Sequence, residues 1–150
     1  MAVAQPLEPK MNKPPLWFKV TVVVALLWNL MGVLAILGNL SLSAADLAAL
    51  PADQQALHRA QPAWSVVCSV IAVVTGTLGC VALFFRKQWA TWLFVVSLMG
   101  IALQDAGLVI AAGSLQALGS VVLVTQGLVL VVAVLLWWLS RRAVARAWIG

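Results

Sequence analysis

One charged side chain, that of Asp105, lies inside a long apolar stretch of this sequence. A carboxylate is costly to hold in hydrocarbon, so an acidic residue in a membrane span is a default candidate for binding a proton or a solute. The preceding residue, Gln104, places an amide beside it. These two residues are therefore the first candidates for a binding site.

Amide and indole groups on two other apolar stretches are candidate partners for Asp105. Gln126 lies seven residues from the nearer end of its stretch, as Asp105 does from the end of its own. At 1.5 Å per residue both lie roughly 10 Å from the same membrane surface, so we expect a hydrogen bond between them. Trp28 and Asn29 lie at a similar or greater depth on the first stretch. Together these side chains predict a polar pocket that opens toward that surface.

A structural role is the alternative for the same polar groups. Hydrogen bonds between membrane helices contribute roughly 0.6–2 kcal/mol each, which is reason enough for them to occur. Small residues at intervals of four, Ala72, Gly76 and Cys80, also indicate packing, because this spacing lets two helices approach closely. We expect them to pack helices within one chain; the alternative is a face for a second copy.

Residues that would support catalysis or metal binding are missing from the sequence. It contains no G-x-S-x-G, H-E-x-x-H or P-loop pattern, which are the signatures of several enzyme classes. Its other acidic residues are Glu8, Asp46 and Asp53, and His58 is its single histidine. A metal site needs more ligands than these provide. We therefore predict a protein that is not an enzyme and that needs no cofactor and no metal.

Two cysteines leave one redox hypothesis open. Cys68 and Cys80 are twelve residues apart, about 18 Å along one helix, which is too far for a disulfide. Small packing residues are the simpler interpretation of both. A membrane enzyme or redox protein that uses either thiol is the alternative.

The composition explains where all these side chains must lie. Of the 150 residues, 64% are hydrophobic and 9% are charged, whereas a soluble domain carries about 25% charged residues. Lipid must therefore be the solvent for most of the chain. Four stretches reach the length of about 20 apolar residues that a membrane helix needs. They are residues 17–40, 64–85, 89–112 and 119–139.

These spans predict an all-α fold, a four-helix antiparallel bundle that forms one domain over residues 1–150. The connections at 86–88 and 113–118 are short. Short connections make consecutive helices antiparallel neighbours. The second span should therefore pack on the third, and the third on the fourth.

Residues 41–63 form a long loop between the first two spans. Ser43 followed by Asp46 suits a helix-start capping box, and Pro51 suits the first turn of a second short helix. Small residues at 41–45 also resemble a signal-peptide cleavage site. The preceding apolar stretch is longer than the usual core of about 7–15 residues, however, which favours a membrane span.

The basic residues orient the bundle. Eight of the nine lysines and arginines fall on one side of the predicted spans, and Arg59 alone falls on the other. The positive-inside rule then puts both tails, residues 1–16 and 140–150, and the connection 86–88 in the cytoplasm. Anionic lipid head groups, rather than nucleic acid, are the partners that the net charge of +5 indicates. We expect a multi-pass protein of the bacterial inner membrane with the loop 41–63 outside.

Several short stretches resemble a family of small bacterial four-helix membrane proteins. They are MNKPPLWFK at 11–19, ALLWNLMGV at 25–33, ALPADQQAL at 49–57, PAW at 62–64, GTLGC at 76–80, RKQWA at 86–90 and SLMGIALQD at 97–105. The resemblance implies a four-helix fold, and members of this family are often called sugar transporters. It implies no catalytic or binding residues. It begins at Met11, which is thus an alternative to Met1 as the first residue.

Two functional classes remain beside the redox hypothesis. The first is a small transporter or permease-like protein in which Asp105 binds a proton or solute, with Gln126 and Asn29 as partners. Four helices enclose little volume, so such a protein would work as a homo-oligomer. The second is a non-transporting accessory protein that interacts through the small-residue face of the second span and the outer loop. The intramembrane aspartate favours the first class.

Overall fold

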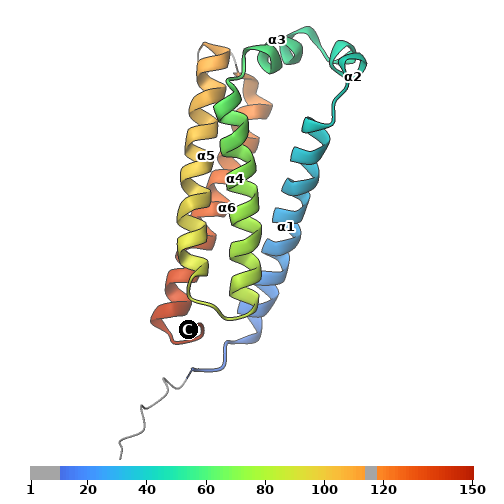
Figure 1. Ribbon diagram of the computed structural model, residues 1–150. Helices are drawn as coiled ribbons and strands as arrows, with labels where there is room; N and C mark the ends of the chain where they lie inside the picture. Colours follow the sequence, from blue (N-terminus) through green and yellow to red (C-terminus); the bar gives the residue numbers. More distant parts are fainter. Residues whose placement is uncertain (1–10, 114–117) are drawn as a thin grey trace, which may run out of the picture.

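The computed structural model describes residues 11–113 and 118–150. Within that part of the chain every regular element is a helix, and four helices are long and apolar enough to cross a membrane. These are α1 (Leu16–Leu40), α4 (Ala63–Phe84), α5 (Ala90–Ala112) and α6 (Gly119–Ala145). They run side by side in alternating directions (Figure 1). The expected all-helical chain with four apolar helices is thereby confirmed.

Apolar length and prolines determine where these helices lie. In hydrocarbon every backbone polar group needs a partner within the protein, and a helix supplies it even for Val-rich sequences that favour strands in water. Pro15 and Pro62 occupy the N-cap positions of α1 and α4, where no helical hydrogen bond is lost. Gly113 ends α5 in the left-handed conformation, with φ of 77°, which glycine adopts readily.

Helix α6 is longer than the apolar pattern predicts. The predicted span ends at 139, but the helix continues to Ala145. The guanidinium of Arg142 lies over the ring of Trp138, 5.0 Å from its centre. This cation–π contact, together with the attraction of cations to a helix C-terminus, stabilises the charged last turns. The expected tail 140–150 is therefore helical as far as Ala145.

The two ends of the bundle differ (Figure 1). The described lysines and arginines other than Arg59 gather at one of them, the basic end, where α4 turns into α5. At the other, the loop end, α2 (Ala44–Ala49) and α3 (Ala52–Ala60) connect α1 to α4. The connection expected at 113–118 lies largely outside the described residues, as do residues 1–10 of the N-terminal tail.

The main apolar core lies toward the basic end. It joins all four long helices through buried side chains, among them Phe18, Val22, Leu83, Phe94 and Leu139. A smaller cluster near the middle of the bundle holds Ala72, Ile101 and Ala133. Membrane helices associate through close packing, because escape from water contributes little between them. The basic end is therefore the firmly held part of the bundle.

Glycines bring α4 and α5 close together. A methyl group on Gly100 would come within 2.9 Å of the backbone oxygen of Cys68, and one on Gly107 within 2.3 Å of the Cβ of Ser65. No side chain fits in these spaces, so the two helices approach each other only because glycine has no Cβ. This seam positions the wall of the site described below.

The small-residue face of α4 lies inside the bundle. Ala72 is 3% exposed and Cys80 is fully buried. Asn29 of α1 and Ser97 of α5 lie directly against Gly76. These small residues therefore pack helices of a single chain, and their burial does not support the alternative of a face for a second copy.

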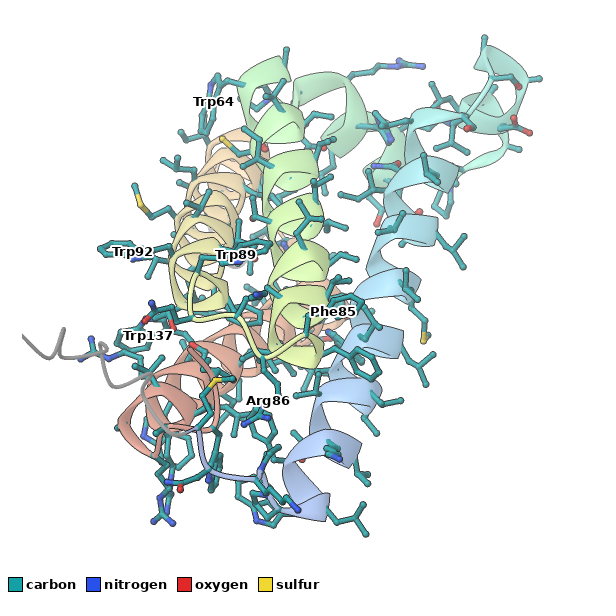
Figure 2. All side chains as sticks on the ribbon, turned by 60° about the horizontal axis from the view of Figure 1, so that its bottom comes forward. Trp64, Phe85, Arg86, Trp89, Trp92 and Trp137 are labelled. Atoms are coloured by element: carbon teal, nitrogen blue, oxygen red, sulfur yellow. The ribbon has the colours of Figure 1, made fainter. Side chains whose placement is uncertain are left out.

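The C-terminal segment, residues 146–150, turns back under the bundle at the basic end. Trp148 and Ile149 are buried there. Arg86, whose φ is +60°, lies at this end (Figure 2) and donates from Nε to the carbonyl of Trp148 at 2.8 Å. The N–H of Gly150 donates to the carbonyl of Arg86 at 3.0 Å. These bonds tie the turn between α4 and α5 to the end of the chain and close the basic end.

Candidate functional site

A cavity of about 960 Å³ lies between α1 and the other long helices. Residues of α1, α3, α4, α5 and α6 line it. It begins beneath α3 at the loop end and ends at Phe94 and Leu136, which belong to the main core. Ligand-binding cavities commonly measure about 300–1,000 Å³, so this one is large enough for a small molecule.

The tilt of α1 creates the cavity. Helix α1 packs on α4 and α6 packs on α5, but α1 and α6 do not pack on each other along their length. They meet toward the basic end, where Phe18, Val22 and Leu139 share the main core. Figure 1 shows α1 leaning away from its neighbours toward the loop end. The space between α1 and α6 is therefore closed at the basic end and opens toward the loop end.

Asn29 lies in the cavity wall beside α4. Its Nδ2 donates to the carbonyl of Ala25 at 2.9 Å and to the sulfur of Cys80 at 3.4 Å. Both amide hydrogens are thus engaged, and Oδ1 lies against Gly76. Asn29 is therefore held by its own helix and by α4 at the place where it lines the cavity.

Gln126 and Asp105 form the expected pair, but only Gln126 faces the cavity. Nε2 of Gln126 donates to Oδ1 of Asp105 at 2.7 Å. Gln126 and Gln104 line the cavity, whereas Asp105 does not. The carboxylate thus orients the Gln126 amide from outside the cavity. No side chain in the described part of the chain bonds the second N–H or the Oε1 of that amide, and both can bond a ligand. This corrects the expectation that Asp105 itself points into the pocket.

Four of the five candidates from the sequence therefore share one wall. They are Trp28, Asn29, Gln104 and Gln126, and they come from α1, α5 and α6. Asp105 stands behind Gln126 as its hydrogen-bond partner. Counting residues inward from the span ends predicts the shared depth of Gln126 and Asp105, because depth follows from the rise of a helix. Asn29 lies deeper, beside Cys80 and Gly76. The direction of the wall side chains, into a shared cavity, depends on how the helices turn toward one another.

The mouth of the cavity holds a pair that the sequence did not predict. Nε2 of His58, on α3, lies 2.8 Å from Oδ1 of Asn39, at the end of α1. Gln61 donates from Nε2 to the hydroxyl of Ser65 at 3.1 Å, and both His58 and Gln61 line the cavity. The loop is thus tied to α1. The signal in the sequence was slight, a single histidine and a polar residue at the end of an apolar run.

The chemistry of the wall is that of neutral hydrogen-bonding groups in an apolar surround. Among the described residues that line the cavity there is no Asp, Glu, Lys or Arg, and His58 is the one histidine. No group of three or more His, Cys, Asp or Glu side chains that could hold a metal ion is found in residues 11–113 and 118–150. Such a wall suits reversible binding of an uncharged ligand.

Comparison with known proteins gives the chain no family. No protein-family model matches it, and no curated protein and no solved structure does so either. The resemblance to small bacterial four-helix membrane proteins therefore stays a prediction from the sequence.

Proposed function

We propose that the chain is a small permease-like transporter whose solute binds in the cavity between α1 and α6. The observation that carries the proposal is the unequal closure of this cavity. It extends beneath α3 at the loop end, and Phe94 and Leu136 close it toward the basic end. A binding site that is open toward one side and sealed toward the other has the form that one state of an alternating-access transporter requires.

The charges and tryptophans support an orientation for this cavity. Lysines and arginines gather on the cytoplasmic side of membrane proteins, and exposed tryptophans favour the two membrane interfaces. Trp89 and Trp92 lie toward the basic end and Trp64 lies at the loop end (Figure 2). On this proposal both termini face the cytoplasm of a bacterium, anionic lipid head groups contact the basic end, and the cavity faces outward.

Asn29, Gln104 and Gln126 are the proposed solute-binding groups. They are the amides that line the cavity below its mouth, and amides both donate and accept hydrogen bonds without carrying charge. Asp105 is a positioning residue, because it holds Gln126 and does not touch the cavity. Trp28 contributes an aromatic surface beside Asn29.

Cysteine accessibility tests the proposal without knowledge of the solute. In a protein with Cys68 and Cys80 changed to Ala, a single cysteine is introduced at Ser69 in the cavity wall, at Val22 in the closed core, or at Ala106. Ala106 is the control, because it lies at a similar depth to Ser69 but is exposed outside the cavity. A membrane-impermeant maleimide is added to oriented vesicles from either side.

If the chain is a transporter, the three cysteine variants should differ in their labelling by the maleimide. Ser69→Cys should react from the outside and Ala106→Cys should not, because a thiol in lipid stays protonated and out of reach of the reagent. Val22→Cys should react from the cytoplasmic side, slowly, whenever the basic end opens. Labelling of Ser69→Cys from the cytoplasmic side alone would reverse the proposed orientation.

A non-transporting accessory protein is the second candidate, and one observation favours it. The apolar windows of α1 and α6 are each only 11% buried, which leaves two helices with wide faces that a partner protein or a second copy could cover. Such a protein has no need to open its basic end. Val22→Cys that never reacts from either side, beside a reactive Ser69→Cys, would favour the accessory role over transport.

A further inference from the structure

We infer that the solute of the proposed transporter is an uncharged amphiphile with one apolar chain, which enters the cavity sideways from the membrane between α1 and α6. This inference rests on the proposed function and specifies its substrate class. Three features of the cavity lead to it: its lack of charge, the order of its polar groups along the bundle, and its open side.

The first feature is charge. No acidic or basic side chain other than His58 is found among the described residues of the wall. The neighbouring Arg59 points its guanidinium at Oε1 of Gln55, 3.2 Å away, and does not line the cavity. A charged head group would lose its hydration here without gaining a partner, which is strongly unfavourable. The wall therefore selects an uncharged molecule.

The second feature is the order of polar and apolar groups. The mouth carries hydrogen-bonding side chains among several leucines. The polar ones are Asn39, Gln54, His58 and Gln61. The floor is apolar, with Phe94 and Leu136. A molecule with a hydrogen-bonding head and an apolar tail matches this order when its head lies at the mouth.

The amides of Asn29, Gln104 and Gln126 lie between mouth and floor. The hydroxyls that line the same depth, those of Ser69, Ser97 and Thr125, already donate to backbone carbonyls. The amides can bond one or two polar groups near the start of a chain, such as an ester. A polyhydroxylated solute such as a hexose, bound below the mouth, would bring more hydroxyl groups than these three amides can pair. Unpaired hydroxyl groups in an apolar site oppose binding. A free sugar therefore fits this wall poorly.

The length of the cavity agrees with a membrane-derived molecule. Val121 and Leu136 both line it and are fifteen residues apart on α6, which is about 22 Å at 1.5 Å per residue. One leaflet of the hydrocarbon core is about 15 Å deep. The cavity thus has room for an acyl chain of one leaflet together with a small head group.

The third feature is the side opening. Met31 of α1 and Val121 of α6 line the cavity and are 66% and 78% exposed, and the two helices do not pack on each other along their length. An amphiphile already in the outer leaflet can therefore reach the cavity without first entering water. Its chain would cover apolar surface on both helices at once.

A photoreactive monoacylglycerol tests the substrate class. The probe carries a diazirine near the end of its acyl chain, and the purified protein is reconstituted in phosphatidylcholine vesicles and illuminated. Mass spectrometry locates the label. We expect saturable labelling on α1, α5 and α6 at cavity-lining positions, with competition by unlabelled monoacylglycerol. The same chain with a phosphate head group should compete about tenfold less well, because its charge has no partner in the wall.

A matched pair of variants tests the location. Ala35→Trp fills the cavity from α1, where Ala35 is an exposed part of the wall, and Ala106→Trp adds the same bulk at a similar depth outside it. Labelling should fall about fivefold or more in the first variant, since the bulky ring occupies the site, and stay unchanged in the second. Equal labelling of both variants, equal competition by the phosphate-bearing chain, or competition by glucose would overturn the inference.

The outcome is separable from that of the proposed function. Saturable labelling of the cavity together with an unreactive Val22→Cys would support binding of the amphiphile and contradict transport. A reactive Val22→Cys without specific labelling would support transport and contradict the amphiphile as its substrate.

Discussion

Toward the basic end all four long helices share one core, whereas toward the loop end α1 stands apart from α6. Both halves are built from the same kind of apolar helix. Apolar length therefore determines that a helix forms and crosses the membrane, but not which neighbour it packs against. That choice depends on side-chain shape at particular positions, as in the contact of Phe18 with the core and of Asn29 with Gly76. Packing is complete where these shapes match, and a cavity remains where they do not.

The difference in packing between the two ends should be weakened most by truncation of Phe18, which has the largest expected effect on stability. Its side chain is 2% exposed in the main core, whereas Leu34 on the same helix is 68% exposed. In lipid a truncated side chain lowers the free energy of unfolding because packing is lost around the space left behind, and not because of transfer out of water. We therefore expect a loss of about 1–3 kcal/mol for Phe18→Ala and close to zero for Leu34→Ala. Unfolding by SDS in mixed micelles, followed by circular dichroism, measures both. Equal losses would show that the two halves are held equally well.

The seam between α4 and α5 supplies the next contrast. Gly107 faces Ser65 so closely that a Cβ would lie 2.3 Å from the Ser65 Cβ, whereas nothing lies within 4 Å of a Cβ at Gly127. We expect Gly107→Ala to cost about 1–2 kcal/mol through forced separation of the helices. Gly127→Ala should be neutral or should stabilise by up to about 1 kcal/mol, because alanine is the better helix former. The same SDS titration compares them, and a harmless Gly107→Ala would contradict the close seam.

Removal of the Arg86 guanidinium should loosen the basic end without unfolding the bundle. Arg86 bonds the carbonyls of Trp148 and Asn12, and the loss of such bonds at a partly exposed site costs about 1 kcal/mol. In Arg86→Gln we expect faster hydrogen exchange of residues 146–150. Lys87→Gln removes the adjacent, exposed charge and serves as the control. An unchanged exchange rate in Arg86→Gln would mean that the burial of Trp148 alone holds the segment.

The smallest expected effect concerns pH at the loop end. Asp46 accepts hydrogen bonds from the Ser43 hydroxyl at 2.6 Å and from the Ser43 N–H at 2.9 Å. These bonds, the hydroxyl first, hold the pKa of Asp46 below its ordinary value. Because the pKa is lowered, these bonds stabilise α2 fully at pH values above the ordinary pKa of aspartate. The stabilisation is lost as the pH falls through the lowered pKa of Asp46. The protection of the α2 amides, which is their exchange relative to the intrinsic rate at each pH, should therefore fall below about pH 4.

The main core gives the internal control for this experiment. Its residues contain no carboxylate, so the protection of its amides should stay constant over the same range. In Asp46→Asn the acid response of α2 should disappear. A response that survives in this variant would assign the effect to another group.

Local patterns explain why much of the fold can be predicted from the sequence. Apolar length gives the four helices, the spacing of Ala72, Gly76 and Cys80 gives a packing face, and the capping box of Ser43 and Asp46 is present as expected. Each of these features is encoded within one turn or one helix. Local signals therefore suffice for them.

The rest of the site depends on contacts between residues far apart in the chain. The tilt of α1 opens the cavity, and it follows from how α1 fits against α4, for example where Gly32 meets Val73. The contact between Asn39 and His58 and the burial of Trp148 are also long-range. For Gln126 and Asp105 the depth could be counted, but not which of the two would face the cavity. Periodicity along one helix carries no information on such relations.

The seal made by the C-terminal segment has a consequence for biogenesis. Residues 146–150 follow α6, so they leave the ribosome after all four apolar helices have been synthesised. Until then Arg86 has no Trp148 carbonyl to bond, and the first turn of α1 lacks the aromatic contact that Trp17 makes with Trp148. The nascent bundle is thus complete in its spans before it is complete in its packing. A chain cut before residue 146 would keep all four apolar helices and still lack these contacts at the basic end.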